Sequence, residues 1–211
     1  MASVNLRTLH VITEPYPDAE GHLLIARDAL EAGARLIQFR SKNESPAERL
    51  SLARKLRAMT RECKAILMVN DFPELAKKVD ANGVHVGKND VPVEVARKIF
   101  GKEKIVGSSA NTVEEALDAV KNGADYVGFG PVFQTFSKPD AASPRGIDAV
   151  RKVRRAFDSA RISVPVIAVG GINEKNALQV MEAGADGLAV VSAVSRSKNR
   201  KKTVKTLLSF I

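Results

Sequence analysis

Hydrophobic and polar positions follow two different periods along this chain. Eight short apolar and β-branched runs alternate with longer stretches in which apolar residues recur every three or four positions, as at Leu52, Leu56 and Met59. The short runs predict strands, and the longer stretches predict helices with one face packed on a sheet. The expected strands are Leu9–Thr13, Leu36–Arg40, Ala65–Asn70, Gly83–Gly87, Ile105–Ser109, Tyr126–Pro131, Val164–Gly170 and Gly187–Ser192.

Eight strand-helix units within 211 residues have the length expected of a closed α/β barrel, the (β/α)8 or TIM barrel. An open doubly wound sheet is the alternative. Glycine-containing turns from helix to strand favour the closed barrel, because glycine readily takes the left-handed conformation that ends a helix. These turns are Ala32–Ala34, Asn82–Gly83, Asn122–Asp125 and Ala183–Asp186. No linker or shift in composition divides the chain, so we expect a single domain over residues 1–211.

Composition narrows the class of protein. The chain is 45% hydrophobic without an apolar run of membrane-spanning length, which predicts a soluble globular protein with no membrane partner. The first ten residues lack the pattern of a signal peptide. Cys63 is the only cysteine, which excludes an intrachain disulfide and is typical of a reducing, cytoplasmic setting.

A net charge of +9 raises the question of a nucleic-acid partner. Much of the excess lies in helix-like segments such as 151–155 and in the tail 196–205, and the chain has no Trp and only two Tyr to stack on bases. We therefore expect a solvated basic surface and anionic small-molecule substrates rather than nucleic acid. The sequence leaves a homo-oligomer open.

Polar residues follow successive predicted strands. In a barrel of this kind the carboxyl ends of the strands form the working face, so these residues are expected to meet at one end of the molecule. A single Asp or Lys after a strand is usually a solvated loop residue, and the shared position carries the argument. The residues are Gln38, Arg40, Lys42, Asn70, Asp71, Asp90, Ser109, Lys138, Gly171 and Ser192.

Asp71 and Asp90 follow neighbouring strands and are candidate ligands of one Mg²⁺ ion. Magnesium commonly binds one or two protein carboxylates together with waters and substrate phosphate oxygens. Capping is the alternative, because Asp71 could cap a helix that begins near Phe72 and Asp90 one that begins near Val91. Asp125 and Asp186 precede strands instead, so we expect structural roles for them.

Gln38, Arg40 and Lys42 alternate with other residues, so their side chains point the same way while the strand continues. Arginine offers a planar fork to phosphate oxygens and lysine a mobile charge. Lys138 lies in the long segment 132–146, which is either an active-site lid or a mobile surface loop. Three cations beside two carboxylates predict a diphosphate site.

A second phosphate site is predicted after the seventh and eighth strands. Gly170 and Gly171 precede a helix there, and Val191 and Ser192 end the last strand. Loops at this place in TIM barrels commonly bind phosphate through backbone amides, although Gly171 could merely permit a tight turn. The three histidines are scattered, and we expect His85 to be a packed residue rather than a base.

These residues resemble the thiamine-phosphate synthase family, from Gln38 through Ser192. The resemblance rests on linked motifs: Gln-x-Arg-x-Lys at 38–42, Asn70-Asp71, the run 83–87 followed by Asp90, 107–109, 128–133 with Thr135, Ser137 and Lys138, 170–172, and Val191-Ser192. Such enzymes join a hydroxymethylpyrimidine diphosphate to a thiazole phosphate, and release thiamine phosphate and diphosphate.

The resemblance implies a role for each matching residue. Asp71 and Asp90 would bind Mg²⁺, and Arg40, Lys42, Ser109 and Lys138 would act in catalysis. The pyrimidine diphosphate would be held by Gln38, Arg40, Lys42, Asn70, Ser109 and Lys138. The thiazole phosphate would be held by Thr135, Ser137, Gly171, Val191 and Ser192.

Four positions depart from the family pattern. The family often has Glu at Ser41, Gln at Lys88, Pro at Gln134 and Thr at Ser137, and none of these changes removes a metal ligand or a charged contact to diphosphate. Two alternatives stay open. A related thiazole tautomerase places a histidine where Pro131 stands, and a noncatalytic phosphate-binding protein would need no metal carboxylates.

Overall fold

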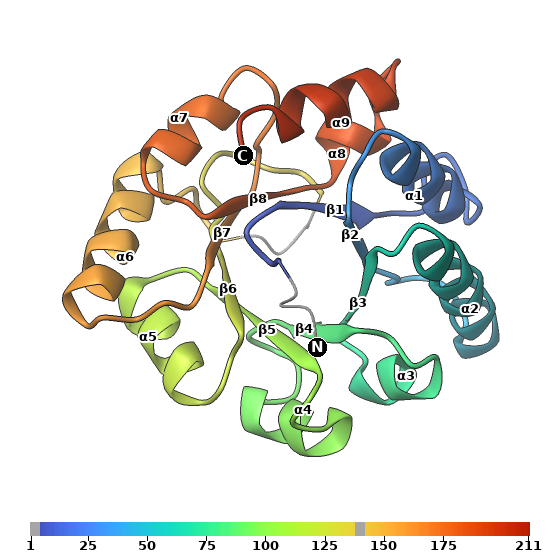
Figure 1. Cartoon of the computed structure of the whole chain (residues 1–211), viewed down its shortest axis with the longest axis horizontal. Coiled ribbons are helices and arrows are strands. Elements are labelled where there is room, and N and C mark those ends of the chain that lie inside the picture. Colours follow the sequence, from blue (N-terminus) through green and yellow to red (C-terminus); the bar gives the residue numbers. More distant parts are fainter. Residues whose placement is uncertain (1–4, 138–141) are drawn as a thin grey trace.

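The computed structural model describes residues 5–137 and 142–211. Its eight parallel strands pair in sequence order and close into a barrel, because β8 also pairs with β1. Helices surround the strands (Figure 1). The predicted (β/α)8 barrel is therefore confirmed and the open sheet is wrong, while the single domain over residues 1–211 stays a prediction.

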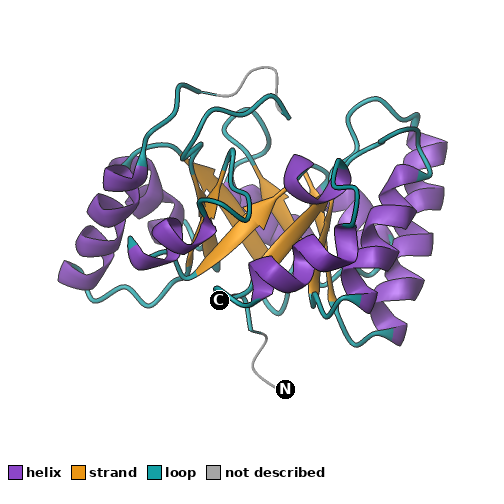
Figure 2. Cartoon of the chain, turned by 90° about the horizontal axis from the view of Figure 1, so that it is seen from above, coloured by secondary structure: helices purple, strands orange, loops and turns teal. Residues whose placement is uncertain are grey.

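The strands are short and helices alternate with them around the barrel. The strands are β1 Leu9–Thr13, β2 Leu36–Phe39, β3 Ile66–Asn70, β4 Gly83–Val86, β5 Ile105–Ala110, β6 Tyr126–Phe129, β7 Val166–Val169 and β8 Gly187–Val190. The helices are α1 Gly21–Glu31, α2 Pro46–Glu62, α3 Pro73–Lys78, α4 Val93–Phe100, α5 Val113–Lys121, α6 Ile147–Ser159, α7 Ala177–Glu182, α8 Ser192–Ser195 and α9 Arg200–Leu208. Figure 2 shows the strands in the middle of the molecule with loops at both ends.

Several predicted strands were too long at their carboxyl ends. Pro131 and Gly170 lie beyond β6 and β7, and Ser192 begins α8 instead of ending a strand. Apolar character continues past the last ladder hydrogen bond at these places, so hydrophobicity alone does not mark the strand end. The consequence for function is that these residues belong to the loops of the barrel mouth.

Two apolar layers hold the barrel together. One lies between strands and helices, and it includes Val11 in β1 and Phe157 in α6. A smaller cluster, with Ile12, Leu36 and Tyr126, comes from the alternate strand positions and fills the barrel interior. The alternation of side chains along each strand therefore decides which residues can reach the mouth.

The helix-to-strand turns fit the prediction with one correction. Gly33, Gly123 and Gly184 have positive φ angles of 106°, 94° and 98°. At the turn before β4, however, Asp80 takes the left-handed conformation, with φ 50°. Gly83 is needed there for space, because a Cβ atom on it would lie 2.3 Å from the Met68 sulfur.

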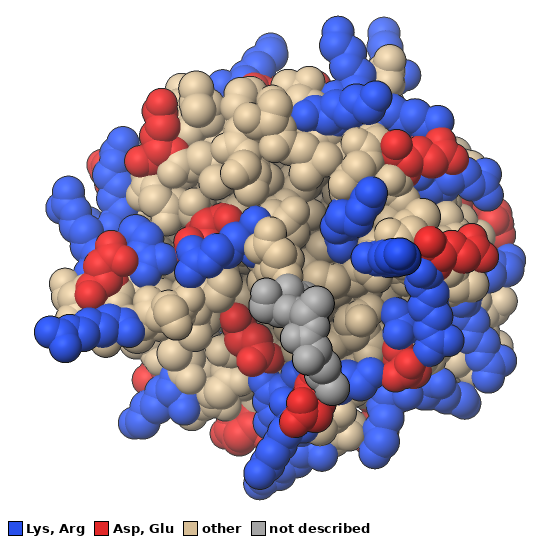
Figure 3. Space-filling view, in the orientation of Figure 1, with Lys and Arg blue, Asp and Glu red and all other residues tan. Residues whose placement is uncertain are grey.

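The surface accounts for the basic composition. On the face drawn in Figure 3, acidic side chains lie among the more numerous basic ones. Surface ion pairs such as Lys201 with Glu31 and Arg151 with Asp148 mix the two signs on the outer helices. Among the described residues, no helix is long and apolar enough to cross a membrane.

Candidate active site

A cavity of about 230 Å³ opens at the carboxyl ends of the strands. Lys138 lies outside the described residues. Every other predicted site residue lines this cavity. These residues are Gln38, Arg40, Lys42, Asn70, Asp71, Asp90, Ser109, Thr135, Ser137, Gly171, Val191 and Ser192.

Local hydrogen bonds fix the loop between β2 and α2, residues 40–45, which we call the cationic loop because it carries Arg40 and Lys42. Ser45 caps α2 by accepting from the Glu48 amide, and the Glu48 side chain accepts from the Ser45 amide in return. This capping box and Pro46 fix where the helix begins, so the residues between β2 and Ser45 form a short loop at the mouth. Arg40 leaves the strand end and donates to the Ser137 carbonyl at 3.4 Å.

The loop after β3 presents Asp71 to the same part of the cavity. Asp71 has a φ of 69°, in the left-handed region that non-glycine residues seldom adopt. Its amide donates to the His85 carbonyl at 2.8 Å. Lys42 Nζ lies 2.5 Å from Asp71 Oδ2, and the Asn70 side-chain amide donates to Oδ1. A strained backbone thus turns this carboxylate towards the cationic loop.

Asp90 faces Asp71 across the loop that follows β4. Its Oδ2 atom accepts from the Gly87 amide at 2.7 Å. Burial raises the pKa of Asp90, and the neighbouring Asp71 carboxylate raises it further. Two carboxylates that repel each other in this way form a site that a cation would stabilise.

The capping alternative for the two carboxylates is wrong. Helices α3 and α4 begin at Pro73 and Val93, and their N-cap residues are Phe72 and Pro92. Neither helix has a side-chain cap hydrogen bond. Asp71 and Asp90 therefore lie before the helices and direct their oxygens elsewhere.

The two carboxylates suit Mg²⁺ in donor type and number. Among the described residues there is no group of three or more His, Cys, Asp or Glu that could hold a metal ion. Magnesium needs only one or two carboxylates when waters and phosphate oxygens supply the rest of its octahedron. The site therefore fits a Mg²⁺ ion that binds together with a phosphate-bearing ligand.

A chain of polar side chains crosses the cavity floor. Gln38 Nε2 donates to the Tyr126 hydroxyl at 3.4 Å, and that hydroxyl lies 2.9 Å from His85 Nδ1. His85 Nε2 lies 2.9 Å from Ser109 Oγ. Burial raises the pKa of Tyr126, so its hydroxyl stays protonated. The chain gives the floor polar groups that can orient a flat heterocycle.

His10 lies beside this chain and was missed from the sequence. Its ring packs edge-on against Tyr126 with centroids 5.0 Å apart, and its Nε2 donates to the Leu6 carbonyl at 2.9 Å. Burial lowers the pKa of His10 to about 4. His85, predicted to be packed, is indeed buried and stacks on Tyr126, but it also lines the cavity. The available signal was a polar residue at an inward strand position.

The opposite side of the mouth is built from the loops after β6, β7 and β8. Gly171 has a φ of 64°, and a Cβ atom on it would lie 2.4 Å from the Gln134 carbonyl oxygen. Glycine is therefore required both for its conformation and for this close approach. Ser192 begins the short helix α8, whose first amides have no acceptor within the helix.

The long segment after β6 is anchored at both ends. Phe133 donates its amide to the Gly170 carbonyl at 3.0 Å, and Gly146 donates to the Val132 carbonyl at 3.0 Å. Phe136 is 88% exposed. Closure of this segment as a lid stays a prediction.

Comparison with known proteins gives consistent matches. The profile described as thiamine monophosphate synthase matches residues 9–194. A thiamine-phosphate synthase of Chloroflexus aurantiacus is 46% identical over 187 residues, which are 88% of this chain and 84% of that protein. One from Methanosarcina barkeri is 42% identical over 96% of this chain and 89% of its own length. A thiamine phosphate pyrophosphorylase structure from Pyrococcus furiosus has a TM-score of 0.86 at 40% identity, covering 98% of this chain and 97% of that one.

Proposed function

The chain belongs to the thiamine monophosphate synthase family, and we propose that its barrel mouth holds a pyrimidine diphosphate, Mg²⁺ and a thiazole phosphate at the same time. The enzyme is a transferase, a thiamine-phosphate synthase, which acts on small molecules. The observation that supports the site assignment most is the gathering of Lys42, Asp71 and Asp90 at a cavity that the glycine pair Gly170–Gly171 also lines.

The pyrimidine diphosphate is assigned to the side of β2, β3 and β5. Arg40 and Lys42 neutralise its phosphates, and Asn70 and Ser109 donate hydrogen bonds to it. Gln38 orients the pyrimidine ring on the floor beside Tyr126. Lys138 is assigned to the diphosphate as well, on the resemblance alone.

Asp71 and Asp90 are the residues assigned to hold Mg²⁺. When bound, the ion supplies positive charge to the diphosphate oxygens as negative charge develops on them. Lys42 Nζ pairs with Asp71, so this lysine is placed to contact a phosphate that binds beside the carboxylate.

The thiazole phosphate is assigned to the other side of the mouth. Thr135 and Ser137 offer hydroxyl groups, and the backbone at Gly171, Val191 and Ser192 offers amides. The two substrates would then lie side by side, with the methylene carbon of one facing the thiazole nitrogen of the other.

The proposed reaction is a dissociative substitution. The aminopyrimidine donates electron density to its exocyclic methylene, the carbon–oxygen bond breaks, and its electron pair leaves with diphosphate. The thiazole nitrogen then shares its lone pair with the cationic carbon, and no protein nucleophile is needed. The protein contributes charge neutralisation by Arg40 and Lys42 and a fixed alignment of the two reactants.

The two alternatives have less support. Pro131 lines the cavity where the tautomerase reading requires a histidine. A noncatalytic protein has no need of the strained Asp71 backbone that turns its carboxylate into the mouth. The cytoplasmic setting and the lack of a nucleic-acid partner remain proposals that rest on composition.

The test is product formation by the purified protein. With pyrimidine diphosphate, thiazole phosphate and Mg²⁺, we expect thiamine phosphate, detected after oxidation to its fluorescent thiochrome form, and no product when Mg²⁺ is chelated. Asp71→Ala should be inactive while its circular dichroism spectrum stays unchanged. Absence of product from folded wild-type protein would contradict the proposal.

A further inference from the structure

A buried polar cluster lies behind the loop that carries Arg40 and Lys42. We call it the His22 cluster; it consists of Thr13 at the end of β1, His22 in α1, Ser41 and Glu44 in the β2–α2 loop, and Arg49 in α2. His22 is fully buried, and Glu44 is 9% exposed. None of the five residues lines the cavity.

The hydrogen bonds of the cluster run from one segment to the next. Thr13 Oγ1 lies 2.8 Å from His22 Nδ1, and His22 Nε2 lies 3.1 Å from Glu44 Oε1. Ser41 donates to Glu44 Oε2 at 2.5 Å. Arg49 donates through Nε to Ser41 Oγ at 3.0 Å and through Nη2 to the Glu44 carbonyl at 2.9 Å.

The charge states of the cluster follow from burial and hydrogen bonding. Burial lowers the pKa of His22, so its imidazole is neutral near pH 7. Burial alone would raise the pKa of Glu44, but hydrogen bonds from Ser41, its own amide and His22 outweigh that effect and lower it. An ionised Glu44 can only accept, so the His22 proton sits on Nε2 and Thr13 donates to Nδ1.

A gain in folding stability does not explain why the His22 cluster is polar. Burying a carboxylate costs several kcal/mol before its partners compensate, and apolar side chains of similar size often stabilise a protein as well or better. The cluster does, however, determine geometry. Ser41 stands between Arg40 and Lys42, so fixing its hydroxyl at 2.5 Å from Glu44 fixes the backbone from which both cations project.

The cluster also contacts the loop after β3, which carries Asp71. The Arg49 guanidinium carbon lies 4.0 Å from the centroid of the Phe72 ring, and Phe72 directly follows Asp71. One set of side chains therefore spans β1, α1, the cationic loop and the loop that carries a metal-site carboxylate. Towards Ser192 the connection runs instead through Glu14, which adjoins Thr13, accepts from Ser195 Oγ in α8 and acts on His22 only through its charge.

We propose that His22 and Glu44 are positioning residues for diphosphate: through Ser41 and Arg49 they hold Arg40, Lys42 and Asp71 in the arrangement that receives Mg²⁺-diphosphate. This inference rests on the proposed function of the cavity. It assigns to this buried pair of side chains a specific effect on the binding of one substrate and not of the other.

Calorimetric titration of the intact protein separates this role from a general structural one. With Mg²⁺ present, we expect Glu44→Ala to weaken inorganic diphosphate binding at least 10-fold and thiazole phosphate binding less than 2-fold. Ser41→Ala, which removes a single hydroxyl, should weaken diphosphate binding about 3-fold and remains informative if Glu44→Ala does not fold.

Glu44→Gln provides the conservative rescue. Its amide oxygen can still accept from Ser41, and its amide nitrogen can donate to His22 Nε2 if the imidazole proton moves to Nδ1 and bonds Thr13. We expect diphosphate affinity within about 3-fold of wild type, together with a change of His22 tautomer in the imidazole ¹⁵N spectrum. A diphosphate affinity as low as that of Glu44→Ala would contradict the proposed role.

The matched control is Arg154→Met in α6. Arg154 Nη1 lies 3.0 Å from Asp186 Oδ2, and neither residue lines the cavity. This substitution should lower the unfolding temperature while leaving both affinities unchanged. If wild-type protein fails to bind diphosphate, the proposed function fails. If wild type binds it and Glu44→Ala binds equally well, or loses both ligands equally, the positioning role is overturned.

Discussion

Acidic and basic side chains lie at both ends of the barrel, but their surroundings differ between the two ends. At the amino ends of the strands, an Asp or Asn just before a strand accepts from an arginine and from a backbone amide of the preceding strand. Asp125 Oδ2, for example, lies 2.6 Å from Arg97 Nη2 and 2.7 Å from the Val106 amide nitrogen. Asp186 repeats this arrangement by accepting from Arg154 and from the Val166 amide. Asn82 does the same with Arg57 and the Leu67 amide.

At the carboxyl ends, the corresponding groups face a cavity. Lys42 pairs with Asp71 while its side chain is 47% exposed, and the Asp90 carboxyl has a raised pKa because burial and Asp71 oppose its charge. A carboxylate that is paired with an arginine and a backbone amide of the same protein contributes to folding stability. A carboxylate that repels a neighbouring carboxylate beside a cavity is available to a ligand. The charge pattern is therefore informative only when its end of the barrel is known.

Among the substitutions that remove a cation, the larger effect is expected at the cavity end. Lys42→Met should lower kcat/KM for the pyrimidine diphosphate about 100-fold, or about 2.7 kcal/mol, because it removes the cation that we assign to the leaving diphosphate. Steady-state kinetics measures this loss. The unfolding temperature of Lys42→Met should stay within about 2 °C of wild type because the Lys42 side chain is half-exposed. A large drop would show that Lys42 stabilises the fold, as the residues at the amino ends of the strands do.

Arg97→Met should show the reverse behaviour. The substitution leaves Asp125 and the Gly123 carbonyl without the arginine and should lower the free energy of unfolding by about 2 kcal/mol. Urea denaturation followed by circular dichroism measures this change. We expect kcat/KM within 2-fold of wild type at a temperature where the variant is folded, and a 10-fold loss of activity would blur the division between the two ends.

Ser109→Ala tests a weaker contact at the cavity end. The hydroxyl contacts His85 Nε2 at 2.9 Å and is assigned to the diphosphate. Loss of one hydrogen bond should lower kcat/KM about 10-fold, or about 1.4 kcal/mol. Single-turnover measurements would distinguish this from complete inactivity, which would require a role in the reaction beyond binding.

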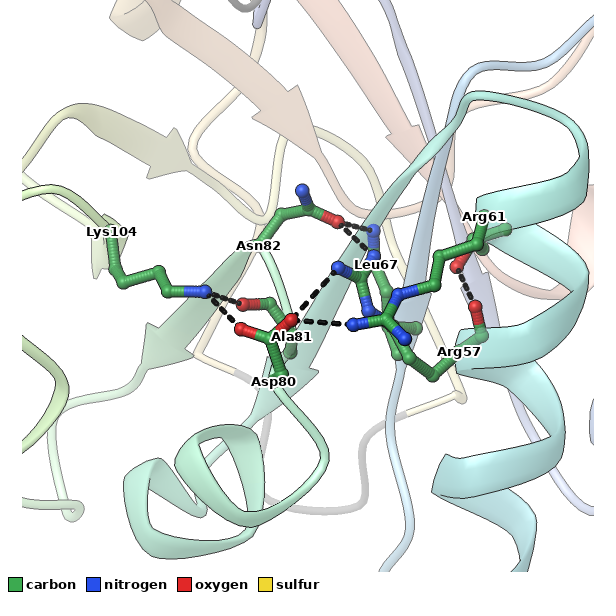
Figure 4. A network of polar contacts seen from close by, with 8 residues as sticks. Arg57, Arg61, Leu67, Asp80, Ala81, Asn82 and Lys104 are labelled. Carbon is green, nitrogen blue, oxygen red and sulfur yellow. Dashed lines mark hydrogen bonds and ion pairs between the residues drawn. The ribbon is translucent and has the colours of Figure 1, made fainter.

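The smallest effect is expected at Asp80, on the stabilising end. Asp80 lies between Lys104 and Arg61 (Figure 4). Its Oδ1 accepts from Lys104 Nζ at 2.6 Å and its Oδ2 from Arg61 Nη2 at 2.6 Å. The Lys104 hydrogen bond and then Arg61 lower the pKa of Asp80 from 3.8 to about 2. Its stabilisation is therefore complete above about pH 4 and is lost as the pH falls towards 2.

Because the Asp80 side chain is 58% exposed, Asp80→Asn should cost less than about 1 kcal/mol at pH 7. The difference in unfolding free energy from wild type should shrink between pH 4 and pH 2. A constant difference across this range would mean that the carboxylate charge is not what stabilises the turn.

Sequence periodicity was sufficient for the barrel and for most of the cavity. Residues just after strands share one end by topology, so Asp71 and Asp90 could be placed at the cavity without coordinates. His10 and Tyr126 could not, because a polar residue inside a strand reads the same whether it packs or lines a pocket. The His22–Glu44 contact joins residues 22 positions apart, and no local pattern marks such a pair.

The division between the two ends is tested most directly by one matched pair of variants, Asp71→Asn and Asp186→Asn. The two carboxylate side chains are similarly buried, 8% and 11% exposed, and the substitution is the same. Measuring kcat/KM and unfolding free energy for both, we predict that Asp71→Asn loses at least 100-fold in activity and little stability. Asp186→Asn should lose stability and keep its activity. Equal losses of both quantities in both variants would contradict the account.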